Sequence, residues 1–171
     1  FFTSRKHPVW APIDIAEVVQ ESLKRVREYQ SRRNVHVHCD PLTSVFAYGD
    51  QEWITMAVTN LLENAIEHTP SESHYRVAVD MDSRKTRVLV EDQGPGITPG
   101  SEYQIFKPFY TTQPGATGLG LANVRRVIEI HGGGIQVAID EDDKMTSGWS
   151  SMQSFELLDD LSPICEEAVK L

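Results

Sequence analysis

The chain has 171 residues and is 40% hydrophobic, so it is long enough to bury one core and to form a single domain. Its 16 basic and 25 acidic side chains give a formal net charge of −9 at pH 7, which opposes binding to nucleic acid or to an anionic membrane surface. The two cysteines, Cys39 and Cys165, lack the spacing of a zinc site or a disulfide framework. No apolar run approaches the roughly 20 residues of a membrane helix, and no signal-peptide pattern is present. These features predict a cytoplasmic domain with reduced thiols and without direct contacts to nucleic acid or membrane.

Regular elements alternate along the chain in a pattern typical of an α+β domain. Helices are predicted where apolar residues recur every three or four positions, and strands where they alternate. In chain order these are a helix at 13–33, strands at 35–39 and 45–48, and a second helix that Asp50 caps and that Thr69 and Pro70 end. Strands at 75–81 and 86–91, a helix at 119–131, and strands at 135–139 and 154–157 follow. The domain so predicted spans 13–158, between a proline-containing linker at 1–12 and a tail at 159–171. About three helices covering one face of a mixed, mostly antiparallel sheet account for this order.

The segment from Asp92 to Gly120 is rich in glycine and proline, and such a long irregular segment inside a compact domain is usually functional. It begins with Asp92-x-Gly94-x-Gly96 after an apolar strand, where a carboxylate can accept a hydrogen bond from an exocyclic amine. It ends with 115–121, which pass directly into a helix whose free N–H groups and dipole favour a polyphosphate. The segment is neither a Walker loop nor a dinucleotide fingerprint, because the G-K-[ST] ending and the βα turn are missing.

A pair of amide side chains lies on the second predicted helix. Asn60 and Asn64 are four residues apart and therefore share one face of the helix. Asparagine inside a helix costs stability unless its amide meets a polar partner. Taken alone, an asparagine is more often a solvated surface amide, by roughly three to one on burial preferences. Together with the segment downstream, the pair indicates a polar binding site.

Five short motifs follow one another along the chain. They are Asn60-x-x-x-Asn64, Asp92-x-Gly94-x-Gly96, Phe106-x-x-Phe109, Gly118-Leu119-Gly120-Leu121 and His131-Gly132-Gly133. This order closely resembles the histidine-kinase branch of the GHKL superfamily (gyrase, heat-shock protein of the ninety-kilodalton class, histidine kinase, MutL) over about 13–139. The segment 105–112 is similar to that of nitrogen-regulation-type sensor kinases. The resemblance implies the Bergerat ATP-binding fold and the catalytic domain of a two-component sensor histidine kinase.

The resemblance implies a role for each motif residue, with ATP and Mg²⁺ as cofactors. Asn64 would coordinate the Mg²⁺ that bridges the phosphates, Asn60 would support the phosphate side, and both are the implied catalytic residues. Asp92 would accept from the adenine amine, and His68 would lie against the adenine ring. The other implied cofactor-binding residues are Gly94, Gly96 and Ile97 beneath the base, the lid anchors Phe106 and Phe109, and the phosphate-binding backbone of Thr117, Gly118, Leu119, Gly120 and Leu121.

The sequence departs from the family at positions that matter for charge. Glu67 and Gln113 stand where many members carry basic residues, so we expect weak ATP affinity with a strong magnesium dependence. Asn60 stands where the hydrolysing members carry a glutamate, and an amide cannot be a general base, which favours transfer over hydrolysis. Glu63 should face about 100° away from Asn64 and is not counted as a base. Cations nearby that could replace some of the missing charge are Lys107, Arg125 and Arg126.

None of the six histidines lies in the family's phosphoacceptor pattern, a helical histidine followed by an acidic residue. The resemblance therefore implies transfer of the γ-phosphate to a histidine on a separate upstream dimerisation domain, with a response regulator as a further partner. The chain itself should be a monomer that does not phosphorylate itself and can be the cytoplasmic part of a membrane-bound sensor. A metal site at His36, His38 and Cys39 is disfavoured because the two histidines share a strand face from which Cys39 points away.

Two alternatives remain open at this stage. The first is a GHKL serine kinase of the anti-sigma type, which an upstream helical hairpin with a His-Glu or His-Asp pair would exclude. The second is a degenerate nucleotide-sensing module without transferase activity, motivated by Glu67 and Gln113.

Overall fold

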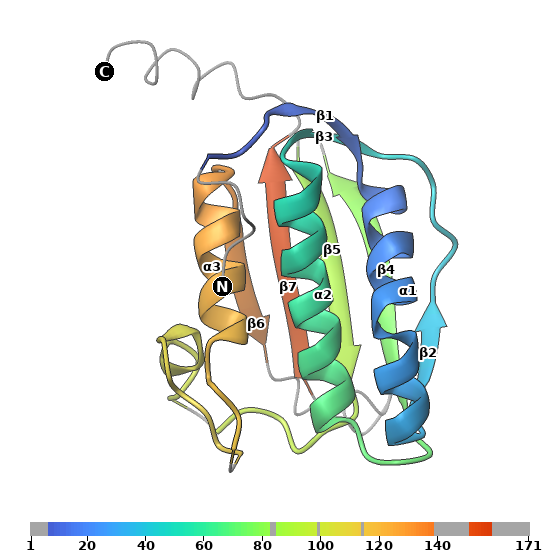
Figure 1. Ribbon diagram of the computed structural model, residues 1–171, viewed down its shortest axis with the longest axis vertical. Coiled ribbons are helices and arrows are strands. Elements are labelled where there is room, and N and C mark those ends of the chain that lie inside the picture. Colours follow the sequence, from blue (N-terminus) through green and yellow to red (C-terminus); the bar gives the residue numbers. More distant parts are fainter. Residues whose placement is uncertain (1–6, 83–84, 99, 114, 139–150, 159–171) are drawn as a thin grey trace.

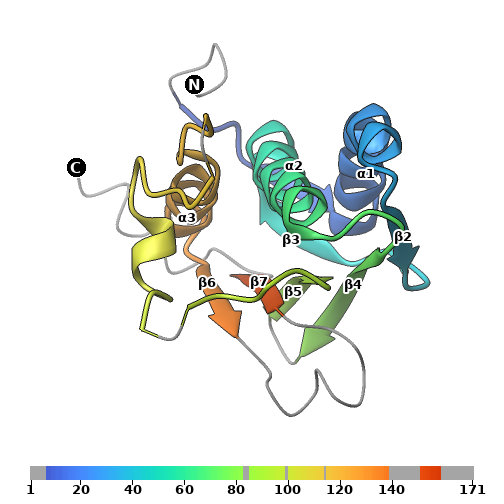
Figure 2. The ribbon, with the colours of Figure 1, turned by 90° about the horizontal axis from the view of Figure 1, so that it is seen from below.

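The computed structural model of the chain describes residues 7–82, 85–98, 100–113, 115–138 and 151–158. Three helices cover one face of a five-stranded sheet (Figure 1). They are α1 (Ile15–Arg33), α2 (Gln51–His68) and α3 (Gly120–Ile130), with α2 in the middle. Seen from below, the helices and the sheet form two separate layers (Figure 2).

The main sheet has the strand order β2-β4-β5-β7-β6. All neighbouring strands are antiparallel except β2 and β4, which are parallel. A second, two-stranded sheet pairs β1 with β3. The strand bounds are β1 Ala11–Asp14, β2 His36–Cys39, β3 Phe46–Gly49, β4 His74–Asp82, β5 Lys85–Asp92, β6 Gly134–Ala138 and β7 Ser151–Leu158. The predicted α+β sandwich, with three helices on one face of a mixed, mostly antiparallel sheet, is confirmed.

Strand β1 is the main difference from the sequence-based prediction. Ala11 and Pro12 belong to this strand, whereas the sequence predicts a linker up to Pro12. Ala11 pairs with Gly49 and Pro12 with Tyr48. Proline is tolerated here because both strands of a two-stranded sheet are edge strands. The partner strand lies more than thirty residues away in the sequence, so no local pattern indicates the pairing.

The helix boundaries follow from side-chain caps. Asp14 accepts a hydrogen bond from the Ala16 N–H, so α1 begins two residues later than predicted. Asp50 accepts from the Trp53 N–H and caps α2, as predicted. Strand β7 begins three residues before the predicted 154–157. The predicted turn at 140–143 and the tail at 159–171 lie outside the described residues.

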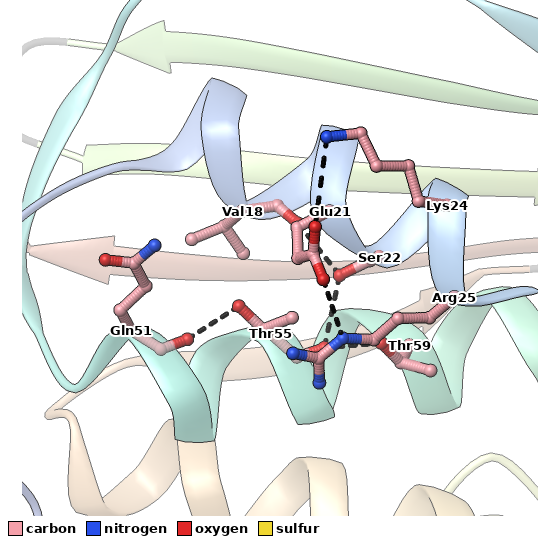
Figure 3. Close-up of polar contacts among 8 residues, drawn as sticks. All are labelled: Val18, Glu21, Ser22, Lys24, Arg25, Gln51, Thr55 and Thr59. Atoms are coloured by element: carbon pink, nitrogen blue, oxygen red, sulfur yellow. Dashed lines mark hydrogen bonds and ion pairs between the residues drawn. The ribbon is translucent and has the colours of Figure 1, made fainter.

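Helices α1 and α2 contact each other through hydroxyl groups as well as apolar side chains. Ser22 is fully buried, and its single O–H is shared between the carbonyl oxygens of Val18, at 2.9 Å, and Thr55, at 3.1 Å (Figure 3). Because its hydrogen bonds are made to the two helix backbones, this small polar residue can lie between the helices without an unpaired group. On the outer side of α1, Glu21 pairs with Arg25 one turn further along.

His131, the first residue of the His-Gly-Gly motif, connects α3 to the start of α2. It is 1% exposed, and its Nδ1 lies 2.7 Å from the Val127 carbonyl oxygen. Its Nε2 accepts from the Asp50 N–H at 3.0 Å. Because a carbonyl can only accept and an amide N–H can only donate, the ring is neutral with its proton on Nδ1. The Trp10 ring lies 4.8 Å away and completes the enclosure.

Folding stability should depend on the neutral state of His131. Burial lowers the pKa of this histidine below its ordinary value of about 6.5. The unfolded chain therefore takes up a proton near pH 6.5 that the folded chain resists, so the stability from this residue is complete above pH 6.5 and is lost as the pH falls below it. Urea unfolding at pH 8, 6.5 and 5.5 should show this loss.

The control is His131→Gln, which cannot titrate. We expect it to cost about 1–3 kcal/mol at pH 8, because the Asp50 N–H and the Val127 carbonyl lose a fitted partner. It should also flatten the pH dependence between 8 and 5.5. An equally steep pH dependence in the variant would assign the loss to other groups.

Candidate functional site

A cleft of about 610 Å³ opens beside the C-terminal half of α2, within the size range of small-molecule sites. One wall is the face of α2 that carries Asn60 and Asn64. The opposite wall is the irregular segment between β5 and α3, which Figure 2 shows running across the end of the molecule. Asp92, at the end of β5, lies between the two walls.

Most of the residues singled out in the sequence meet in this cleft. Those that line it are Asn60, Asn64, His68, Asp92, Gly96, Ile97, Thr117, Gly118, Leu119, Gly120 and Leu121. They come from α2, β5, the irregular segment and α3, which are separated by up to sixty residues of sequence. Gly94, Phe106 and Phe109 are not among the lining residues.

Gly94 supports the cleft from behind. The Asp92 carboxylate is 2% exposed, and its Oδ1 accepts from the Gly94 N–H at 2.8 Å. A Cβ at position 94 would lie 2.7 Å from this oxygen and 2.8 Å from the His68 carbonyl oxygen. Only glycine therefore lets this turn approach the end of α2 closely, which places Asp92 and His68 beside each other in the cleft.

The α2 wall of the cleft carries carboxylate side chains as well as the amides of Asn60 and Asn64. Glu63 and Glu67 line the cleft alongside Asn64, although Glu63 lies about 100° around the helix from Asn64. The pKa of Glu63 is raised, first by its partial removal from water and then by the nearby charge of Glu67. No lysine or arginine is among the described residues that line the cleft. A polyanion bound here needs a cation to offset these carboxylates.

The start of α3 faces the cleft with free backbone donors. Leu119 is the N-cap residue and makes no side-chain cap hydrogen bond, so the first N–H groups of α3 have no capping side chain. Gly118 has φ 64°, and its carbonyl oxygen accepts from the Phe109 N–H at 2.9 Å. This hydrogen bond closes residues 109–118 into a loop that ends at the helix N-terminus, an arrangement suited to phosphate.

The two phenylalanines of the irregular segment have different surroundings. Phe106 is 8% exposed and ends the short 3-10 helix η1 (Gln104–Phe106), which contacts α3. Phe109 is 76% exposed and has φ 66°. Only Phe106 is thus placed to hold the segment against the domain. The implied role of Phe109 as an anchor stays a prediction.

The cations proposed to replace the missing basic residues are engaged elsewhere. The Arg125 guanidinium lies 5.0 Å from the Tyr103 ring centroid and pairs with Glu129 at 2.7 Å. The Lys107 ammonium lies 5.9 Å from the same ring. Neither residue lines the cleft, and neither does Arg126. The tyrosine between them carries no recognisable sequence signal and was missed.

Sequence reasoning also missed a polar residue of the cleft. Gln153 of β7 lines the cleft although the sequence gives only a weak strand signal there. Among the described residues, the buried side-chain oxygens without a hydrogen-bond partner are Thr69 Oγ1 and Gln153 Oε1.

The histidines of β2 and Cys39 lie on opposite faces of the strand. His36 and His38 are exposed on one face of β2, and Cys39 is half-buried on the other, as the alternation predicts. Within the described part of the chain, no group of three or more His, Cys, Asp or Glu side chains is placed to hold a metal ion.

The part of the sequence that forms the cleft matches a known protein family. The family model for histidine kinase-, DNA gyrase B- and HSP90-like ATPases matches residues 49–157. The chain belongs to this family. The match includes α2, β5, the irregular segment and α3, which are the elements that build the cleft.

Within this family the chain is similar to sensor histidine kinases. It is 37% identical over 135 residues to the signal transduction histidine-protein kinase/phosphatase MprB of Mycobacterium avium (strain 104), covering 75% of this chain and 25% of that protein. It is 39% identical over 138 residues to MprB of Mycobacterium leprae, again over 75% of this chain and 25% of the relative. The chain thus spans about a quarter of the length of these relatives.

Solved structures agree with the sequence relatives. A mycobacterial sensor histidine kinase MprB superimposes with a TM-score of 0.75 at 31% identity, covering 88% of this chain and 97% of that chain. The nucleotide-free catalytic domain of the histidine kinase ThkA gives 0.76 at 27% identity over 88% and 96% of the two chains. ThkA in complex with the response regulator TrrA gives 0.74 at 24% identity, over 92% and 44%. The protein has the sequence and fold of the ATP-binding catalytic domain of a sensor histidine kinase.

Among the described residues, no helix of this domain is both long enough and apolar enough to cross a bilayer.

Gly118 and Gly115 offer a matched test of the loop before α3. Both have positive φ, but a Cβ at Gly118 would lie 2.6 Å from the Tyr110 carbonyl oxygen, whereas one at Gly115 meets nothing within 4 Å. Gly118→Ala should therefore weaken binding of an ATP analogue by about tenfold through the collision, and Gly115→Ala by much less. Equal losses in a fluorescence titration would contradict a steric requirement at Gly118.

Proposed function

We propose that this domain binds ATP with Mg²⁺ in the cleft and transfers the γ-phosphate to a histidine of a separate domain of the same kinase. The observation that carries the proposal is the arrangement of three features around one cleft. The Asp92 carboxylate is suited to an adenine amine, the amides of Asn60 and Asn64 to the phosphate side, and the open N-terminus of α3 to phosphate oxygens.

The donor set fits Mg²⁺ bound jointly with a nucleotide. Mg²⁺ prefers oxygen ligands and is commonly held by one or two protein groups together with substrate phosphates and water. Asn64 offers an amide oxygen on the cleft wall. When bound, the ion would neutralise phosphate charge during transfer. Because Glu63, Glu67 and Asp92 line the cleft and no described lining residue is a lysine or an arginine, binding should depend strongly on this neutralisation.

Transfer is favoured over hydrolysis by the chemistry of α2. Asn60 lies half-buried on the cleft wall, and its amide cannot accept a proton from water. Glu63 is the carboxylate nearest in sequence to Asn64, but its raised pKa reflects desolvation and a like charge rather than a hydrogen-bond partner that would orient it. A histidine nucleophile supplied by another domain needs no water activation, so the cleft has only to position the phosphates.

The relatives suggest the rest of the system. The relatives named as histidine-protein kinase/phosphatase are about four times as long as the matched region, and ThkA has been solved with a response regulator. We infer that this domain acts with an upstream dimerisation and phosphoacceptor domain and with a response regulator, in the cytoplasm. The similarity to histidine kinases favours this reading over a serine kinase of the anti-sigma type.

The first test is calorimetric titration of the chain with a non-hydrolysable ATP analogue, with and without Mg²⁺. Asp92→Ala should weaken binding by about tenfold to a hundredfold, since it removes a buried charged acceptor. Asn64→Ala should remove the difference between the titrations with and without Mg²⁺. A wild type that fails to bind at millimolar analogue would instead support a degenerate module in which Glu67 and Gln113 mark a decayed site.

The second test addresses transfer. ATP labelled at the γ-phosphate should not label the chain alone, because none of its histidines lies in the phosphoacceptor pattern. Adding the protein's own upstream domain should yield an acid-labile, alkali-stable phosphate on that domain, and Asn64→Ala should abolish it. Release of free phosphate at the same rate with and without the second domain would indicate an ATPase.

A further inference from the structure

Gln153 presents an unpaired hydrogen-bond acceptor at the cleft. The residue is 4% exposed and lines the cleft from β7. Its Oε1 is buried, with no partner among the described residues. A buried oxygen without a donor is unfavourable, and native structures rarely keep one without a reason. A ligand N–H that reaches this oxygen would remove the penalty.

The strand register places Gln153 near Asp92. Gln153 pairs with Val90 of β5, so Asp92 lies two residues further along the neighbouring strand and on the same face of the sheet. Such diagonal neighbours are about 7–8 Å apart. The long Gln153 side chain and the shorter Asp92 side chain, at this separation, can converge on one small group between them.

The residues paired with Gln153 on the two neighbouring strands carry no side-chain hydrogen-bond donor. Its register partners are Val90 on β5 and Val137 on β6. Both are apolar, so this amide lies in a valine row on the inner face of the sheet. A packing role alone would be met better by a leucine or methionine, because the buried Oε1 loses its water without gaining a hydrogen bond.

We propose that Gln153 is a second acceptor for the exocyclic amine of adenine and so helps to select 6-aminopurine nucleotides. This inference rests on the proposed binding of ATP in the cleft. The amine carries two N–H groups in the plane of the base. Asp92 accepts one of them, and Gln153 Oε1 accepts the other.

The test compares an ATP analogue with its counterpart that lacks the 6-amino group, at constant Mg²⁺. Gln153→Leu should weaken binding of the adenine nucleotide by about tenfold, the effect of one buried hydrogen bond, and should leave the affinity for the 6-deamino nucleotide almost unchanged. Gln136→Leu is the matched control, because Gln136 is exposed on the adjoining strand β6 and does not line the cleft. It should change neither affinity.

Equal losses for the two nucleotides in Gln153→Leu would overturn the inference, since a purely structural role weakens both alike. Unchanged affinity for both would also overturn it. Circular dichroism checks that the variant folds, and Gln153→Met provides the same comparison if Gln153→Leu does not. If the wild type binds neither nucleotide, the proposed function fails as well, whereas wild-type binding with an unaltered preference in the variant refutes only the role of Gln153.

Discussion

The burial of α2 is the constraint on which the site depends. Ile54, Leu61, Leu62 and Ile66 are fully buried, so the rotation of this helix about its axis is fixed by the removal of these side chains from water. Once that face is set against the sheet and the flanking helices, the remaining stripe with Asn60 and Asn64 has to face the cleft. The Asp50 side chain caps α2, and the Asp50 N–H donates to His131 Nε2, so hydrogen bonds connect the start of α2 to the end of α3. Helices α2 and α3, which both contribute residues to the cleft, are thereby held together at this end.

The charge of the cleft decides what the site can bind. Three carboxylates line it, while the nearby cations of the irregular segment and α3 are engaged with Tyr103 and Glu129. Attraction of a polyphosphate must then come from backbone N–H groups at the start of α3 and from a bound divalent ion. Such a site discriminates by geometry and metal rather than by net charge. Under the proposed function, this site would bind nucleotide weakly without the metal ion and would act on a histidine of a second domain.

Sequence patterns predicted the parts of the fold that depend on local spacing. The apolar periodicity of α1 and α2, the cap at Asp50 and the glycine-rich entry to α3 each leave a signal within a few residues, and these elements were found close to their predicted bounds. Strand β1 was missed because its partner β3 lies more than thirty residues away. Gln153 was missed for the same reason, since its place beside Asp92 follows from the register of β5 with β7. Glu63 lines the cleft although it lies about 100° around the helix from Asn64, because a glutamate side chain is long enough to reach the rim of a wide cleft.

The fold alone does not separate a transferase from a hydrolase, because the family joins kinases with ATPases. The difference lies in side chains at a few positions of a common cleft. Asn60 stands one turn before Asn64, where it can hold a phosphate oxygen but cannot take a proton from water. With no base at that position, transfer under the proposed function would depend on a nucleophile brought by another domain. That nucleophile would have to reach the phosphate side of the cleft, near the N-terminus of α3, where the Phe109 N–H donates to the Gly118 carbonyl oxygen.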